Sequence, residues 1–162
     1  MLLAFEPWPE NIETIKSQLE LNQIMNCTVI EAAVSDSAGE VEFCGGPDTS
    51  TAHIKRQENE RRETHIVKSV TLDEFSTARR PADFVKMDIE GAETIALKGA
   101  HELLNSANPP KFMIELHGQA AAQRVCEILE RESYSFYTLE RARIQSSFVP
   151  PHVLALPNKT IA

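Results

Sequence analysis

In the first part of the chain, short runs of consecutive hydrophobic residues alternate with segments in which hydrophobic residues recur at helical spacing. Leu2–Phe5 is an apolar run that ends at Glu6, which predicts a buried strand. Residues 27–34 predict the next strand, because they are β-branched at their start, and 41–43 predict a short strand after it. Between these strands a helix is expected to begin at Pro9, since apolar side chains step by four, three and four residues along one helical face: Trp8, Ile12, Ile15 and Leu19.

The second half of the chain continues to alternate strands with helices. Thr71 and Glu74 have the spacing of a capping box, which predicts a short helix there. Further helices are expected over 91–104 and around 122–129, with strands at 66–70, 83–88, 112–118, 134–137 and 152–156. This alternation indicates βαβ crossovers, so the predicted fold class is α/β with a mainly parallel sheet.

The segment 45–65 departs from this pattern because it is polar. Only Ala52 and Ile54 are clearly apolar in it, and residues 55–63 form a run of mixed charge. We therefore expect a surface excursion, partly helical, that supplies no core strand. The chain has 162 residues, a length that fits one domain, so 1–162 is expected to be a single domain.

Composition and charge exclude several classes of protein. Twenty-four acidic against sixteen basic residues give a formal charge of −8, whereas a nucleic-acid-binding protein would carry a basic face. No apolar run approaches the ~20 residues that a membrane helix needs, and the first residues lack the regions of a signal peptide. The three cysteines (Cys27, Cys44 and Cys126) are widely spaced, which indicates reduced thiols. We expect a cytoplasmic protein with neither nucleic-acid nor membrane partners.

Polar side chains follow the predicted strands. In an open α/β sheet, ligands bind beyond the carboxyl ends of the strands. These residues are therefore the candidates for chemistry: Glu6, Ser35, Asp36, Asp88, Glu90, Glu115 and His117. Acids in such places can instead cap a following helix, and for Asp36 and Asp73 both interpretations stay open. Capping is less expected for Glu6, because Pro7 and Pro9 leave few N–H groups for its carboxylate to accept.

Short blocks occur in a fixed order along the chain. They are AFEPxPEN (4–11), LELN (19–22), AAVSDxxGEV (32–41), VTLD (70–73), VKMDIEGAE (85–93), LKGA (97–100) and IELH (114–117). Together they resemble the ordered blocks of the FkbM-type methyltransferases, and the likeness extends to about Gly118. These are class I enzymes that use S-adenosylmethionine, typically to methylate oxygen on small molecules or sugars. The resemblance implies a Rossmann-like fold with helices on both faces of the sheet.

The resemblance also implies roles for the residues after the strands. Glu6, with Asn11, would bind the cofactor ribose, since a carboxylate can accept both ribose hydroxyls. Ser35 and Asp36 would approach adenine, and Asp88 would face the methionine part of the cofactor or the acceptor. Glu90, Glu115 and His117 would surround a small-molecule acceptor, with His117 as the candidate general base. In the alternative interpretation, His117 is structural and donates to a carbonyl or to Glu115.

One part of the family pattern is not found in this sequence. Family members place a strand and a glycine-rich turn of the DxGxxxG kind before the Phe-Glu-Pro block, which here begins at Phe5. We therefore expect the first strand and helix of the class I fold to be missing, which would leave strand edges uncovered. The chain would then be a truncated piece, a decayed homologue, or a protein whose sheet edge is covered by self-association or by a partner chain.

Three alternatives stay open. Asp88, Glu90, Glu115 and His117 could ligate a divalent ion, but no ligand spacing demands it and no metal is expected. A non-catalytic module of the same fold would act through a partner. A dinucleotide-dependent oxidoreductase is disfavoured, because the chain has no GxGxxG. The acceptor itself depends on loops such as 45–65 and 140–151, so the sequence does not identify it.

Overall fold

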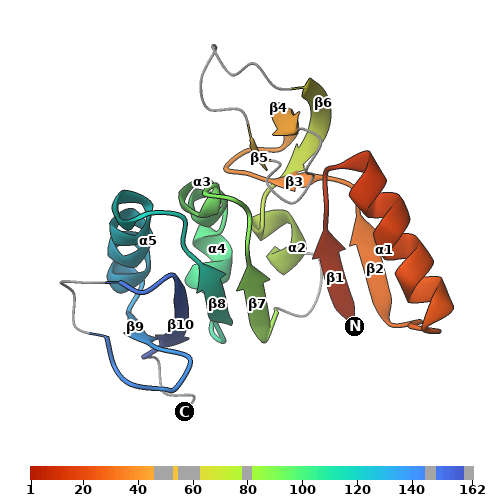
Figure 1. Ribbon diagram of the computed structural model, residues 1–162. Helices are drawn as coiled ribbons and strands as arrows, with labels where there is room; N and C mark the ends of the chain where they lie inside the picture. Colours follow the sequence, from red (N-terminus) through yellow and green to blue (C-terminus); the bar gives the residue numbers. More distant parts are fainter. Residues whose placement is uncertain (46–52, 55–62, 78–81, 145–148, 159–162) are drawn as a thin grey trace. The chain divides into compact units, whose positions relative to one another are not determined.

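The computed structural model describes residues 1–45, 53–54, 63–77, 82–144 and 149–158. The chain divides into two compact units, Met1–Val70 and Thr71–Ala162. The labels of their helices and strands follow Figure 1. No helix in the described ranges has the length and apolar character needed to cross a membrane.

The first unit opens with a βαβ arrangement, as the hydrophobic pattern predicts. Strand β1 (Leu2–Phe5) and strand β2 (Cys27–Ile30) pair in parallel, with Leu2 opposite Cys27. Helix α1 (Pro9–Leu21) connects them and begins with a proline, whose missing N–H would have no partner in the first turn anyway. Ile12 is the residue of α1 that is buried.

The rest of this unit is a second sheet with the strand order β3-β6-β4-β5. Its strands are β3 (Ala33–Val34), β4 (Gly39–Gly45), β5 (His53–Ile54) and β6 (Glu63–Val70). The single strand predicted over 27–34 is wrong: it is two strands, because β2 pairs with β1 whereas β3 pairs with β6.

The prediction for 45–65 needs a second correction. Strand β5 and the start of β6 lie inside this segment, and both pair antiparallel with β4. Pairing with β4 satisfies the backbone of these residues although the local sequence is polar, which is why the hydrophobic pattern did not reveal them. Residues 46–52 and 55–62, including the predicted helical part, lie outside the described ranges.

The core of this sheet is built around Trp8. Its indole packs with Ala33 and Phe43, and the centroids of the Trp8 and Phe43 rings are 6.1 Å apart. His65 meets the indole edge-on, at 4.7 Å between centroids. Gly45 lies against the same ring, and a Cβ at this position would fall 2.6 Å from Cζ2 and Cζ3 of Trp8 and closer still to Cη2. The indole therefore occupies the space that any other residue at 45 would need.

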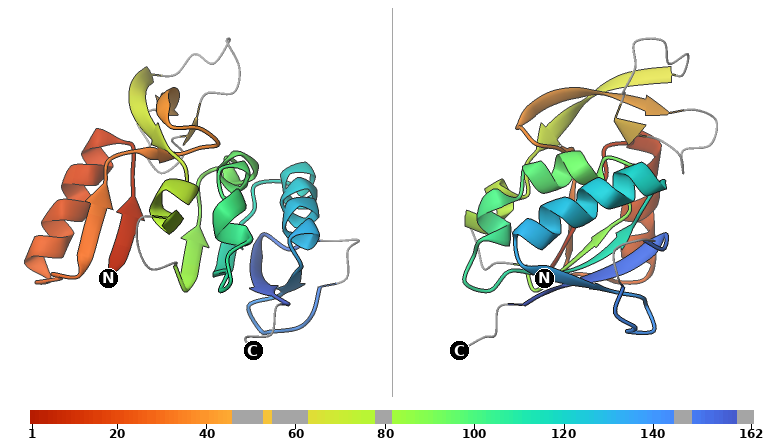
Figure 2. Two further views of the ribbon diagram at one scale, coloured as in Figure 1. Left: turned by 180° about the vertical axis from the view of Figure 1, so that it is seen from behind. Right: turned by 90° about the vertical axis from the view of Figure 1, so that its left-hand side faces the viewer.

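The second unit alternates helices with the strands of a sheet whose order is β7-β8-β10-β9. The strands are β7 (Phe84–Met87), β8 (Lys111–Glu115), β9 (Tyr134–Tyr137) and β10 (His152–Pro157). The helices are α2 (Asp73–Thr77), α3 (Glu93–Lys98), α4 (His101–Leu104) and α5 (Gln119–Arg131). Figure 2 shows α5 alongside α3, which it contacts.

Helix capping explains two local features of this unit. The capping box is confirmed: Glu74 Oε2 accepts the Thr71 N–H at 2.8 Å, and Thr71 Oγ1 accepts the Glu74 N–H at 3.2 Å. The single helix predicted over 91–104 is wrong, because it breaks between Lys98 and His101. Asp73 accepts the N–H groups of Glu102 and Leu103, at 3.1 and 2.8 Å, and so caps the second piece, which favours the capping interpretation of this acid.

The α/β class is confirmed, but the sheets are mixed rather than mainly parallel. Parallel pairs join β1 to β2, β3 to β6 and β7 to β8. Antiparallel pairs join β4 to both β5 and β6, and β10 to both β8 and β9. The cause is topological: β10 returns between β8 and β9, and β4 is followed by strands that fold back on it instead of crossing over through a helix.

The core of the second unit lies between its sheet and its helices. Phe112 and Ile114 of β8 are buried at alternate positions, as are Val153 and Ala155 of β10. Tyr134 at the start of β9 meets Phe112 edge-on, and its hydroxyl donates to the carbonyl of Pro110 at 2.8 Å. Helical residues complete this core, namely Ala96, Leu97, Leu103, Leu104, Ala122, Val125 and Leu129.

Candidate active site

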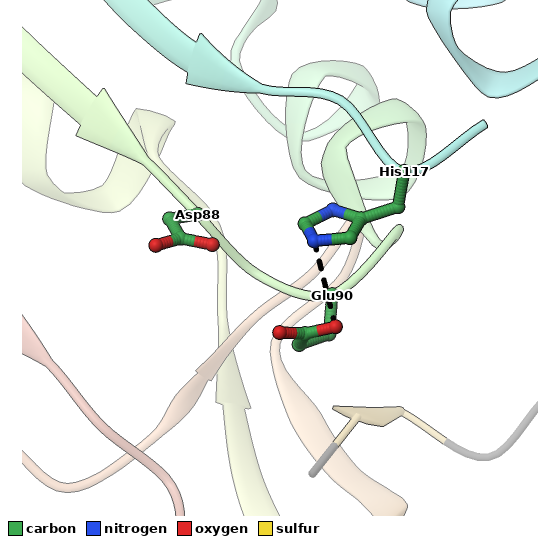
Figure 3. A group of neighbouring side chains, drawn as sticks. All are labelled: Asp88, Glu90 and His117. Atoms are coloured by element: carbon green, nitrogen blue, oxygen red, sulfur yellow. Dashed lines mark ion pairs between the residues drawn. The ribbon is translucent and has the colours of Figure 1, made fainter. Parts of the chain in front are cut away.

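Three of the predicted site residues come together in the second unit, beyond the ends of β7 and β8. These strands are parallel neighbours, so their carboxyl ends meet at one edge of the sheet. Asp88 follows β7 directly and His117 follows β8. Glu90 lies on the turn after Asp88. Figure 3 shows the His117 ring directed at Glu90, with the Asp88 carboxylate on the same side.

The side chains of these three residues lie close together and are partly exposed to solvent. His117 Nε2 lies 3.5 Å from Glu90 Oε2, and one ligand atom from each of the three residues lies within 4.8 Å of the others. Their side chains are 29–35% exposed. Lys86 Nζ lies 3.0 Å from Asp88 Oδ2 and partly offsets the local negative charge. Such a cluster can accept a proton from a bound hydroxyl or ligate a cation.

The turn that carries Glu90 has an unusual backbone. Glu90 has φ 52° and Gly91 has φ 88°, so two successive residues lie in the left-handed region. Glycine adopts this conformation without strain, whereas a residue with a Cβ does not. The turn places the Glu90 carboxylate at His117 and then starts α3.

Glu93 is a functional candidate that sequence reasoning missed. Its side chain is fully buried, and its Oε1 lies 3.2 Å from His117 Nδ1. The same oxygen accepts the Gly91 N–H at 2.9 Å. The only available signal was its place in the VKMDIEGAE block, because an acid in the first turn of a helix is usually a solvated one.

Glu115, by contrast, does not join this cluster. It ends β8 and faces His152 of the neighbouring strand β10, with 3.2 Å between Glu115 Oε2 and His152 Nε2. Both side chains are at least 36% exposed. The contact between His117 and Glu115 that the sequence allowed is replaced by contacts of His117 with Glu90 and Glu93.

Two predicted cofactor residues meet in the first unit, after β1. Glu6 is half-buried, and burial raises the pKa of its carboxyl, although hydrogen bonds from the Trp8 backbone and the Asn11 side chain partly offset this effect. Glu6 Oε1 accepts the Trp8 N–H at 2.8 Å. The prolines were expected to leave Glu6 few N–H groups to accept, and the one that it does accept lies between Pro7 and Pro9.

The other predicted cofactor pair, Ser35 and Asp36, follows β3. Ser35 is buried, and its N–H donates to the Val70 carbonyl at 2.8 Å. Its hydroxyl donates to Asp36 Oδ1 at 3.4 Å, and the Ser37 hydroxyl donates to the same oxygen at 3.3 Å. Asp36 is exposed and precedes a strand, so it caps no helix here.

Comparisons with known proteins identify the fold and the family of this chain. The solved structure of methyltransferase FkbM from Methylobacillus flagellatus KT is similar to this chain, with a TM-score of 0.57 and 18% identity, a likeness of fold alone. The match covers 94% of this chain and 35% of that one, so this chain spans about a third of its length. No curated protein matches significantly. The family model of the methyltransferase FkbM domain matches residues 1–136. The chain therefore belongs to the FkbM methyltransferase family.

Proposed function

We propose that this chain is an S-adenosylmethionine-dependent methyltransferase that methylates a hydroxyl oxygen of a small molecule or sugar, on a Rossmann-like class I fold. The observation that carries this proposal is the His117 ring, with a carboxylate at each of its two nitrogens, beyond the ends of two parallel strands. Membership of the FkbM family supports methyl transfer as the reaction class.

The residues after β1 and β3 have the chemistry to hold the cofactor. Glu6 is half-buried and already fixed by one backbone N–H, so its carboxylate can accept ribose hydroxyls with little loss of side-chain freedom. Asn11 and the Ser35–Asp36 pair add polar groups for ribose and adenine. The Asp88 carboxylate can accept a hydrogen bond from the ammonium group of the cofactor's methionine part or from the hydroxyl to be methylated. When bound, S-adenosylmethionine supplies an electrophilic methyl group.

The acceptor needs alignment and removal of its proton. Methyl transfer is an in-line displacement, so the protein mainly holds its two reactants in line. His117 is the proposed base, because Nε2 lies 3.5 Å from Glu90 Oε2 and Glu90 can stabilise a protonated imidazole. Glu115 lies apart from this cluster, and we assign it to the outer wall of the acceptor pocket.

Cofactor binding is tested by calorimetry on the full chain. Glu6→Ala should weaken S-adenosylmethionine binding by about 2–3 kcal/mol, or roughly 30- to 150-fold, the effect of losing charge-assisted hydrogen bonds. Glu13→Ala, an exposed acid on α1, is the matched control. Equal affinities would remove Glu6 from the site. A wild-type chain that binds no cofactor would be explained by the non-catalytic module or by the lack of a DxGxxxG turn in this sequence.

Catalysis is tested by transfer of a labelled methyl group to a panel of sugars and small alcohols. For an acceptor that reacts, His117→Ala should lower turnover by ~10²-fold or more, with cofactor affinity nearly unchanged. His101→Ala, an exposed histidine on α4, should leave turnover as it is. A matching loss of cofactor affinity in His117→Ala would make this histidine structural.

A further inference from the structure

Glu93 is a fully buried acid at the start of α3, directly after the left-handed turn. Its side chain has no exposed surface, and its two described contacts are the Gly91 N–H and His117 Nδ1, both on Oε1. Within the described residues, Oε2 has no hydrogen-bond partner. A carboxyl group in such a place is costly to bury unless a charged or strongly polar group compensates it.

The contacts of Oε1 fix the direction of both hydrogen bonds. A backbone N–H can only donate, so Oε1 accepts from Gly91. A proton on Oε2 would find no described acceptor, and a proton on Oε1 would oppose the Gly91 N–H. Oε1 is therefore the acceptor for both the Gly91 N–H and His117 Nδ1, and Nδ1 must carry a hydrogen.

We propose that Glu93 is a positioning residue that holds neutral His117 in its Nδ1–H tautomer, which leaves the Nε2 lone pair to take a proton. The catalytic part of this inference rests on the proposed function. Nε2 takes the proton of the acceptor hydroxyl: the O–H bond breaks, an N–H bond forms, and the electron pair stays on the acceptor oxygen. The protonated ring is then flanked by Glu93 at Nδ1 and Glu90 at Nε2.

The tautomer can be measured without any substrate. In ¹⁵N-labelled full-length protein, long-range ¹H–¹⁵N correlations distinguish a protonated ring nitrogen from one with a free lone pair, and His117→Gln assigns the signals. Neutral His117 should carry its hydrogen on Nδ1. A wild-type ring protonated on Nε2 overturns the proposal.

Two variants at position 93 distinguish the effect of the Glu93 hydrogen-bond acceptor on the His117 ring from the effect of its negative charge. Glu93→Met keeps the volume but removes the acceptor, so the Nε2–H tautomer should become populated. Glu93→Gln keeps a carbonyl oxygen that the Gly91 N–H holds in place, so the Nδ1–H tautomer should persist. Glu127→Met on α5, at an exposed acid, is the control and should leave the His117 signals unchanged. If the Glu93→Met protein keeps Nδ1–H, Glu93 does not set the tautomer. If that variant does not fold, the wild-type and Glu93→Gln spectra decide.

Turnover separates this inference from the proposed function. In a chain that transfers methyl groups, Glu93→Met should lower kcat by up to about 10²-fold and leave cofactor affinity unchanged. A chain with the expected tautomer but no methyl transfer would count against the proposed function alone. A chain with methyl transfer but the opposite tautomer would count against the role of Glu93 alone.

Discussion

The contact between Gly45 and Trp8 predicts a large effect for a small substitution. Gly45→Ala adds one methyl group, which would lie 2.6 Å from two indole carbons and closer to a third. The indole is 2% exposed and is held by Phe43 and His65, so it cannot move aside freely. Overpacking of this kind costs about 1–3 kcal/mol, because side chains leave their preferred rotamers.

The assay is urea unfolding followed by tryptophan fluorescence. Trp8 is the one tryptophan of the chain, so its emission reports on the first unit. A loss of about 1–3 kcal/mol should lower the midpoint clearly, or the melting temperature by about 4–8 °C per kcal/mol for a unit of this size. In a double-mutant cycle followed by circular dichroism, Gly45→Ala should lower the free energy of unfolding much less in a Trp8→Phe background, because the smaller ring leaves room for the methyl group.

Two results would refute this reasoning. An unchanged midpoint and emission maximum for Gly45→Ala would mean that the indole has room for the methyl group. An additive cycle would mean that the alanine acts through the backbone and not through Trp8. In either case the close approach at 45 would not be the reason for a glycine there.

Three further predictions concern stability, pH and metal. Tyr134→Phe should cost about 1–2 kcal/mol in thermal unfolding, because the Pro110 carbonyl loses its buried donor. Burial raises the pKa of the Glu6 carboxyl above its ordinary 4.5. The protonated carboxyl therefore stabilises the fold fully below pH 4.5, and this stabilisation is lost as the pH rises through the raised pKa. In urea titrations, the Glu6→Gln protein should lose less stability than the wild type between about pH 4 and 7. If His117 is the base, EDTA should leave methyl transfer unchanged, whereas loss of activity and its restoration by a divalent cation would make Asp88, Glu90 and His117 metal ligands.

Hydrophobic spacing predicted most elements because their apolar faces are buried locally. The helix at Pro9 and the strand before it need only the contacts of their own βαβ unit. The break at Gly99 and the split of 27–34 could not be predicted from spacing. The first depends on Asp73, 29 and 30 residues from the N–H groups that it caps, and the second depends on which sheet each half joins.

The candidate site was predicted in part for a similar reason. Asp88, Glu90 and His117 follow adjacent parallel strands, and the rule that ligands bind at strand ends brings such residues together. Glu115 also ends a strand, but its side chain meets His152 of β10, a strand that was predicted but not as an antiparallel neighbour of β8. Glu93 was missed because its importance depends on a contact with His117, 24 residues away.

At Glu90, the left-handed backbone lowers the stability of the fold, whereas the side chain supplies the carboxylate that faces His117. A residue with a Cβ pays about 1–2 kcal/mol in this conformation relative to glycine, so Glu90→Gly should make the second unit more stable while removing the carboxylate that faces His117. A selection for heat resistance alone would therefore favour loss of this side chain. Engineering of this protein for stability should hold position 90 fixed, because a thermal melt would score the loss of the Glu90 carboxylate as an improvement.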